Sequence, residues 1–184
     1  MRIISGTHKG KKLLPFPGKN IRPTSDRLRE SIFNILADRI QGALVLDLFA
    51  GTGALGIEAL SRGAGAATFI EKDASAVTIL KKNLHACGLK ENAHVIQWDI
   101  LINLNCVHSI TPGFNLVFMD PPYQKDMVQP ALRHLSNSNA LQNNACLVIE
   151  HSKFDPMPNI LKAFRLKDVR KYGKTLVSFL EYMV

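Results

Sequence analysis

The stretch VLDLFAGTGALG at residues 45–56 decides the fold. It opens with a short apolar run, interrupted only by Asp47, which is typical of a strand buried on both faces of a parallel sheet. Glycines follow at 51, 53 and 56, where a tight turn must lead into a helix. Strand, glycine turn and helix in this order indicate an open α/β sheet, which binds ligands at the carboxyl ends of its strands.

The same alternation continues along the rest of the chain. The pattern predicts strands at 43–48, 66–70, 94–98, 115–119 and 145–150, with helices at about 54–62, 73–87 and 126–136. Two further strands, 165–171 and 175–182, flank the turn 172–174 and are expected to form an antiparallel hairpin. We therefore expect an α/β fold with a Rossmann-like, doubly wound sheet of seven mostly parallel strands and a C-terminal antiparallel hairpin.

Residues 1–23 have a different character. Apolar pieces at 2–5 and 12–16 are punctuated by glycines and prolines, which predicts a small β-hairpin arm packed on the core and ending in a loop. A helix capped by Thr24 or Ser25 and ended by Gly42 is expected next. Its apolar face should hold Leu28, Ile32, Ile35, Leu36 and Ile40, which would leave Arg27, Arg29 and Glu30 on other faces.

Charge is concentrated in the arm. The chain has a formal net charge of +8, and residues 1–30 hold eight basic and two acidic side chains. Such a segment is typical of a protein that docks on a polyanion, since neutralised phosphates release counterions. A second basic run at 162–174 is equally consistent with a solvated face.

Several classes of protein do not fit the composition. Apolar runs such as 43–48 and 145–149 are far shorter than the ~18–20 residues that cross a bilayer, and residues 1–10 lack the apolar core of a secretory signal. We therefore expect a cytoplasmic protein with no membrane contact. Cys87, Cys106 and Cys146 are unpatterned and should be reduced, and their spacing to His85 and His108 does not suit zinc, so no metal is expected.

The glycine turn is ambiguous alone. With Glu71 twenty residues after Gly51, it also fits a dinucleotide-binding pattern. Asp47 distinguishes the two cases, because a carboxylate repels a pyrophosphate but attracts the ammonium of an amino-acid-bearing cofactor such as S-adenosylmethionine. The alternative for Asp47 is a hydrogen bond to loop amides.

Two more acids end neighbouring strands. Glu71 is placed to bind both ribose hydroxyls, unless it is simply a solvated strand end. Asp99 could accept from an adenine amino group while Ile100 packs on the ring, and the alternative for Asp99 is a capping aspartate. Trp98 is expected to pack on a buried strand rather than to stack on a base.

The second motif is DPPY at residues 120–123, directly after the predicted strand 115–119. The prolines fix an extended turn and leave the Asp120 carboxylate and the Pro121 carbonyl as acceptors. Two acceptors that grip the hydrogens of an aromatic amine aim its lone pair at an electrophilic methyl group, with Tyr123 stacked on the ring. A simple Pro-Pro turn with a core tyrosine is the alternative.

The residues 47–53 (DLFAGTG) and 120–123 (DPPY) resemble the class I S-adenosylmethionine-dependent methyltransferases that act on amino groups of bases. Segments 2–13 (RIISGTHKGKKL), 21–34 (IRPTSDRLRESIFN) and 56–64 (GIEALSRGA), with YGKT at 172–175, are similar to the RsmD-type 16S ribosomal RNA guanine-N2 methyltransferases. The resemblance covers essentially the whole chain. It implies a methyltransferase domain at 24–184, a monomer, and one target guanine in small-subunit RNA, within an assembled or nearly assembled subunit.

The resemblance also implies roles for individual residues. Asp120, Pro121, Pro122 and Tyr123 would form the catalytic turn. The cofactor-binding residues would be Asp47, Phe49, Ala50, Gly51, Thr52, Gly53, Glu71, Lys72, Asp99 and Ile100. The RNA-binding residues would be Arg2, Lys9, Lys11, Lys12, Arg22 and Arg27, although a surface ion pair is an equal alternative for Arg27. Arg22, Thr24 or Asp26 would close over the methionine end of the cofactor.

Other functions remain open. A methyltransferase of DNA adenine or cytosine, or of protein glutamine, would keep the DPPY motif but needs no arm of this pattern. A nicotinamide-dependent oxidoreductase explains only the glycines. A non-catalytic RNA-binding module would keep the basic arm and has no need of the acceptor turn at Asp120.

Overall fold

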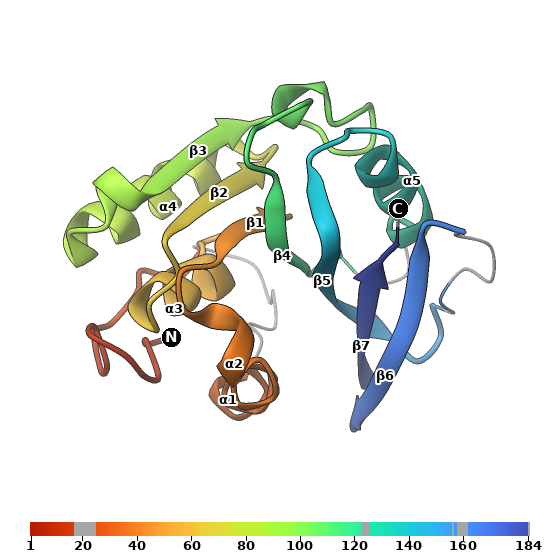
Figure 1. The fold of residues 1–184 in the computed structure, drawn as a ribbon. Helices are drawn as coiled ribbons and strands as arrows, with labels where there is room; N and C mark the ends of the chain where they lie inside the picture. Colours follow the sequence, from red (N-terminus) through yellow and green to blue (C-terminus); the bar gives the residue numbers. More distant parts are fainter. Residues whose placement is uncertain (17–24, 123–125, 156, 158–161, 184) are drawn as a thin grey trace.

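A seven-stranded sheet in the order β3-β2-β1-β4-β5-β7-β6 organises the chain (Figure 1). The structure is a computed structural model, and it describes residues 1–183 except 17–24, 123–125, 156 and 158–161. The strands are β1 Leu44–Leu48, β2 Ala66–Glu71, β3 Ala93–Gln97, β4 Phe114–Met119, β5 Leu141–Ser152, β6 Phe164–Tyr172 and β7 Thr175–Tyr182. The helices are α1 Asp26–Ile35, α2 Ala37–Ile40, α3 Ala54–Ser61, α4 Ala74–Cys87 and α5 Val128–Ser136, with short 3₁₀ turns η1 Lys90–Asn92 and η2 Asn105–Val107.

The direction in which the chain crosses the sheet reverses between β1 and β4. From β1 the chain moves outward through β2 to β3, and then returns to place β4 on the other side of β1. These strands and β5 are parallel, whereas β7 is antiparallel to both β5 and β6. The predicted α/β fold is confirmed, and its topological switch point lies at the carboxyl ends of β1 and β4.

Apolar side chains of the sheet alternate between two buried clusters. Val45 packs in a cluster with α1, α3 and α4, whereas Leu46 packs in a cluster with α5 on the other face. Ile3 and Leu13 of the arm belong to the first cluster, so the arm shares the core of the domain. Arm residues Arg2 and Lys12 form an antiparallel bridge, which is the small hairpin expected from the sequence.

Some expected elements differ in detail. The helix expected up to Gly42 stops at Ile35 and resumes as α2, because Leu36 leaves helical geometry while its own side chain and Ile40 remain in the core. Ile35 is consequently 45% exposed, so its expected place on the buried face was wrong. Trp98 was expected on a buried strand, but β3 ends at Gln97 and is an edge strand with partly exposed side chains. Trp98 nevertheless packs against the cluster that contains Leu46, as expected.

Candidate active site

The turn from β1 into α3 contains three residues in the left-handed region of backbone conformation. Phe49, Gly51 and Gly53 all have positive φ angles, of 60°, 55° and 86°. A Cβ on Gly53 would lie 2.2 Å from Cδ1 of Leu80, so a larger residue there would displace this side chain of α4 in addition to the strain of its positive φ. The turn is held by the Ala50 amide, which donates to the Ile70 carbonyl at 3.0 Å. The glycine loop is therefore fixed at the carboxyl end of the sheet.

The Asp47 side chain lies beneath this loop. It is 2% exposed, and its Oδ2 accepts a hydrogen bond from the Gly56 amide at 2.9 Å. Burial, with a smaller contribution from Glu71, raises the pKa of Asp47 to about 8, while the bond from Gly56 opposes the shift. The structure thus shows the backbone-bonding role of this carboxylate. Contact with a cofactor ammonium stays a prediction.

Glu71 ties two loops together at the end of β2. Its Oε2 accepts from the Gly51 amide and its Oε1 from the Asp73 amide, both at 2.9 Å. Asp73 in turn caps α4 by accepting from Ser75 and Ala76. Glu71 is therefore oriented by the glycine loop itself, and ribose binding by its carboxylate stays a prediction.

The next strand end carries Asp99 and Ile100. Asp99 caps the following turn through a 3.0 Å bond from the Leu101 amide to Oδ1, and its Oδ2 lies 3.7 Å from Nζ of Lys72. Ile100 is buried, and its carbonyl lies 2.9 Å from Nδ1 of His134. The capping role of Asp99 is present, together with an ion pair that joins the ends of β2 and β3.

The DPPY turn leaves the neighbouring strand. Leu48 of β1 pairs with Met119 of β4, so Phe49 and Asp120 follow adjacent strand ends at the switch point. Asp120 is half-buried, Pro121 buried and Pro122 exposed. Tyr123 lies outside the described residues. The structure thus brings the glycine loop and the start of the acceptor turn to one edge of the sheet.

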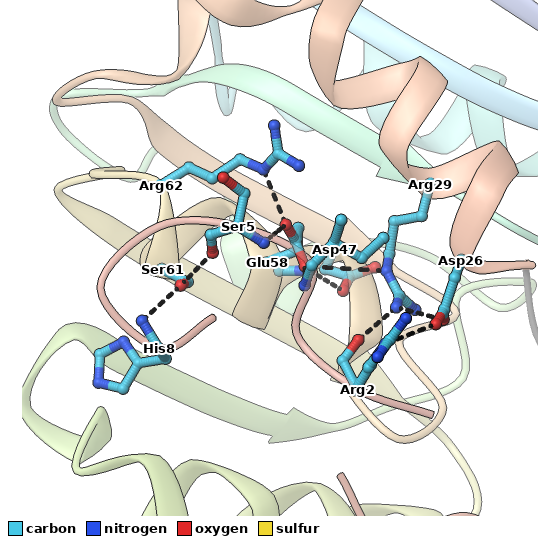
Figure 2. Close-up of polar contacts among 11 residues, drawn as sticks. Arg2, Ser5, His8, Asp26, Arg29, Asp47, Glu58, Ser61 and Arg62 are labelled. Atoms are coloured by element: carbon cyan, nitrogen blue, oxygen red, sulfur yellow. Dashed lines mark hydrogen bonds and ion pairs between the residues drawn. The ribbon is translucent and has the colours of Figure 1, made fainter. Parts of the chain in front are cut away.

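Sequence analysis missed a buried ion-pair network beside this edge (Figure 2). Glu58 of α3 is 1% exposed and accepts from the backbone amides of Ile4 at 2.8 Å and Ser5 at 3.0 Å. Its Oε1 also accepts from Nε of Arg62 at 2.7 Å. A lone acid in the apolar run 55–60 was the available indication, because a buried carboxylate requires partners.

Arg29 completes the network, and its expected position on another helix face was wrong. The side chain is fully buried, with Nε 3.8 Å from Glu58 and Nη2 donating to Asp26 at 3.0 Å and to the Arg2 carbonyl. Burial lowers the pKa of Arg29, and the charges of Glu58 and Asp26 act in the opposite direction. Its Nε and Nη1 form no hydrogen bond with the described residues. Arg29 is thus held mainly by charge.

The end of α3 binds the following residues of the arm. Oγ of Ser61 donates to the Ser5 carbonyl at 2.7 Å and accepts from the His8 amide at 3.0 Å, while the Ser61 carbonyl accepts from Thr7 at 2.8 Å (Figure 2). Gly6 has a φ of +83°, and a Cβ there would lie 1.8 Å from the Ser61 carbonyl oxygen. We call this set, residues 4–8 with Glu58 and Ser61, the clasp. It joins two sequence motifs, 2–13 and 56–64, which are far apart along the chain.

A second connection runs from the arm to the glycine loop through Asn83 of α4. This side chain is 1% exposed. Its Oδ1 accepts from the Leu14 amide at 2.7 Å, and its Nδ2 donates to the carbonyls of Leu14 at 3.3 Å and Thr52 at 3.0 Å. Arm and loop are therefore bridged by one buried amide.

The expected RNA-binding side chains lie mostly on the surface. Arg2, Lys9, Lys11, Lys12 and Arg27 are exposed, and Arg22 lies outside the described residues, as does Thr24. Arg2 pairs with Asp26 at 3.2 Å. Within the described part of the chain the other four form no ion pair, and the pair considered for Arg27 is not found there.

Among the described residues, no group of three or more His, Cys, Asp or Glu side chains is arranged to hold a metal ion. None of the helices in the described ranges is long and apolar enough to cross a membrane.

Comparison with known proteins gives concordant matches. The family described as conserved hypothetical protein 95 matches residues 1–181. The Ribosomal RNA small subunit methyltransferase D of Haemophilus influenzae is 39% identical over 158 residues, which are 85% of this chain and 81% of that protein. The protein of the same name from Escherichia coli K12 is 39% identical over 160 residues, 87% of this chain and 79% of that one. The solved structure of Escherichia coli yhhF superposes with a TM-score of 0.88 at 33% identity, over 100% of this chain and 98% of that one.

Proposed function

From the membership of this chain in the conserved hypothetical protein 95 family, we propose that it transfers a methyl group from S-adenosylmethionine to the exocyclic N2 of a specific guanine in 16S ribosomal RNA. The chain belongs to that family along nearly its whole length, as the sequence resemblance predicted. The two relatives compared above are named as methyltransferases of small-subunit ribosomal RNA. The proposal goes further than these names in two respects. It specifies N2 of guanine as the methyl acceptor and an assembled or nearly assembled small subunit as the substrate.

The observation that carries the proposal is the pairing of Leu48 with Met119. This register sets the glycine loop and the Asp120-Pro121 turn at adjacent strand ends, where an open α/β sheet binds its ligands. A cofactor site and an acceptor site thereby share one edge, as group transfer between two bound molecules requires.

The chemistry of the loop suits S-adenosylmethionine. Asp47 is a buried carboxylate with no described cation beside it, and Glu71 and Asp99 end the next two strands. A group that brings an ammonium and a nucleoside would complement these acids. In the proposed complex Asp47, Phe49, Ala50, Gly51, Thr52 and Gly53 surround the methionine end, and Glu71, Lys72, Asp99 and Ile100 contact the nucleoside. When bound, S-adenosylmethionine supplies an electrophilic methyl group attached to a sulfonium.

The acceptor turn would then activate the amine. The guanine N2 is a poor nucleophile because its lone pair is delocalised into the ring. The Asp120 carboxylate and the Pro121 carbonyl would accept its two hydrogens and favour a pyramidal nitrogen, while Pro122 fixes the turn and Tyr123 stacks on the base. As the N–C bond forms and the S–C bond breaks, the nitrogen proton becomes acidic and leaves to Asp120 or to water.

The exposed cations of the arm support an RNA substrate. Arg2, Lys9, Lys11, Lys12, Arg22 and Arg27 would bind backbone phosphates and leave recognition of the base to the turn. A base in a loop can enter the pocket at modest cost, because it is not fully stacked.

The test is transfer of labelled methyl from S-adenosylmethionine to small ribosomal subunits, naked 16S RNA and DNA in parallel, with the modified nucleoside identified by mass. We expect N2-methylguanosine from the subunit fraction, and no label with Asp120→Ala despite retained binding of S-adenosylhomocysteine. Label in DNA adenine or cytosine would contradict the proposal and identify a different base-amino methyltransferase.

A further inference from the structure

We propose that the groove between α4 and the edge strand β3 is a second RNA-binding surface, which holds backbone phosphates of the substrate away from the target base. The proposal rests on the function proposed above and adds a contact that lies outside both the arm and the catalytic turn. We call this surface the α4 groove. It is formed by Lys81, Lys82, His85 and Lys90 at the rim with Ala93 and Val95 at the floor.

The α4 groove is an open depression with a cationic rim. Its volume is about 560 Å³, within the ~300–1,000 Å³ that ligand sites commonly occupy. The rim side chains are exposed, whereas Ala93 and Val95 are half-buried. His85 lies four residues after Lys81 and three after Lys82, so its side chain neighbours both lysines on the surface of α4. Phosphates could contact the rim while sugars pack on the floor.

The positive charge of the rim is not neutralised within the described chain. Lys81, Lys82 and Lys90 form no ion pair with any described residue, and no acid lines the groove, although Glu91 is exposed beside Lys90. The basic run on β6 differs. Its Arg165 and Lys167 both pair with Glu181, and Arg170 pairs with Asp168. Lys171 and Lys174 of that run form no ion pair with the described residues, so both surfaces retain charge for a polyanion. The α4 groove differs because its three unpaired lysines border a depression.

The α4 groove is also next to the arm. Leu14 is bonded to Asn83 on the same helix, and Lys11 lies near enough to Cys87, at the end of α4, to act on its thiol electrostatically. Ala93 pairs with Ala67 at the start of β2, so the groove extends toward the edge of the sheet opposite to Glu71. The arm thus contacts the same helix that forms the groove, and Lys11 lies near the end of that helix.

RNA fits the α4 groove better than an added peptide strand does. An added strand would use the outer edge of β3, and its affinity would come from backbone hydrogen bonds rather than lysines. Phosphates instead require several cations at roughly nucleotide spacing, and no Phe, Tyr or Trp side chain lines the groove to stack on a base. The expected contact is therefore electrostatic and independent of sequence.

The experiment compares two triple variants of the full chain. Lys81→Ala/Lys82→Ala/Lys90→Ala removes the rim, and Lys153→Ala/Lys171→Ala/Lys174→Ala removes the same charge from exposed positions elsewhere. Affinity for naked 16S RNA and for small subunits is measured by filter binding from 50 to 300 mM salt. We expect the slope of log Kd against log salt to fall by about 2–3 for the rim variant only, at ~0.7–0.9 per phosphate contact. Affinity for S-adenosylhomocysteine and kcat at saturating RNA should not change.

Three results would overturn the proposal: an unchanged slope, an equal loss in both triple variants, or a loss confined to subunits. A loss of affinity for subunits but not for naked RNA would indicate that the α4 groove binds a ribosomal protein instead. Because RNA binding is measured without methyl transfer, the groove proposal and the proposed function can fail independently of each other. If the label appeared in DNA while the rim variant still lost RNA affinity, the function would be wrong and the surface would stand.

Discussion

Leu14 exchanges two hydrogen bonds with the buried side chain of Asn83, its amide donating at 2.7 Å and its carbonyl accepting at 3.3 Å. The same Asn83 amide nitrogen also donates to the Thr52 carbonyl at 3.0 Å. The end of the described arm and the glycine loop are thus bonded to one side chain. Displacement of either would leave a buried polar group without its partner.

We expect Asn83→Ala to weaken both stability and cofactor binding. Loss of three buried hydrogen bonds should lower the free energy of unfolding by about 2–3 kcal/mol and free the Thr52 carbonyl to shift. Affinity for S-adenosylhomocysteine should fall about tenfold by calorimetry. Asn92→Ala is the control, because Asn92 bonds only the Gly65 carbonyl at an exposed position. Unchanged affinity in Asn83→Ala would show that the loop does not depend on the arm.

Glu58→Gln should destabilise the fold strongly. It leaves the buried Arg29 guanidinium without its nearest buried carboxylate, which costs about 3–5 kcal/mol in comparable sites. Adding Arg29→Met should restore part of the loss, because the uncompensated charge is removed. Urea unfolding of the two single variants and the double variant measures this coupling. Asp168→Asn, in the exposed pair with Arg170, should change stability by less than about 1 kcal/mol. Additive effects of Glu58→Gln and Arg29→Met would argue against the charge pairing.

The protonation of Asp47 makes stability depend on pH. Its pKa of about 8 in the folded chain compares with about 3.9 when unfolded. Between these values the folded chain keeps a proton that the unfolded chain has released, so the free energy of unfolding falls as pH rises, by up to ~1.4 kcal/mol per unit. Asp47→Asn keeps an acceptor for Gly56 and lacks this dependence.

From pH 5 to 8, the free energy of unfolding of the wild type should therefore fall relative to that of Asp47→Asn. Above pH 8 the difference between the two proteins should become constant. Urea unfolding across this range provides the measurement. Parallel plots of the free energy of unfolding against pH for the two proteins would show that Asp47 is ionised in the folded state throughout this range.

Asp120→Asn tests the catalytic turn. The amide keeps one oxygen acceptor but carries no negative charge, so kcat should fall by about 10²–10³. Affinity for S-adenosylhomocysteine should stay within about threefold, since Asp120 follows a different strand from the glycine loop. Asp38→Asn on α2, at an exposed position, should leave kcat unchanged. A parallel loss of cofactor affinity in Asp120→Asn would place this residue in the cofactor site instead.

Local patterns sufficed for the sheet but not for the arm. Each strand and each crossover helix has its own apolar period, so the order of elements could be predicted from residues a few positions apart. The clasp depends on contacts between residues more than fifty positions apart, such as Ser5 with Glu58. The periodic pattern of apolar residues in the sequence does not indicate such a pair. Arg29 was misplaced for the same reason, because its burial depends on an acid from another helix.

Asp47 and Asp99 show a second limit. In both cases the sequence left two roles open, and the structure shows the backbone-bonding one. A short carboxylate at a strand end satisfies neighbouring amides whether or not it also meets a ligand.

The clasp has a consequence for anyone who would exchange recognition arms between related enzymes. Glu58 and Ser61 bind the backbone of residues 4–8, and only a glycine fits at position 6 against the Ser61 carbonyl. The arm is therefore not a portable module. A working chimera must transplant the end of α3 and the position of Asn83 together with the arm. The structural unit to be exchanged is thus discontinuous and spread over three segments of the chain.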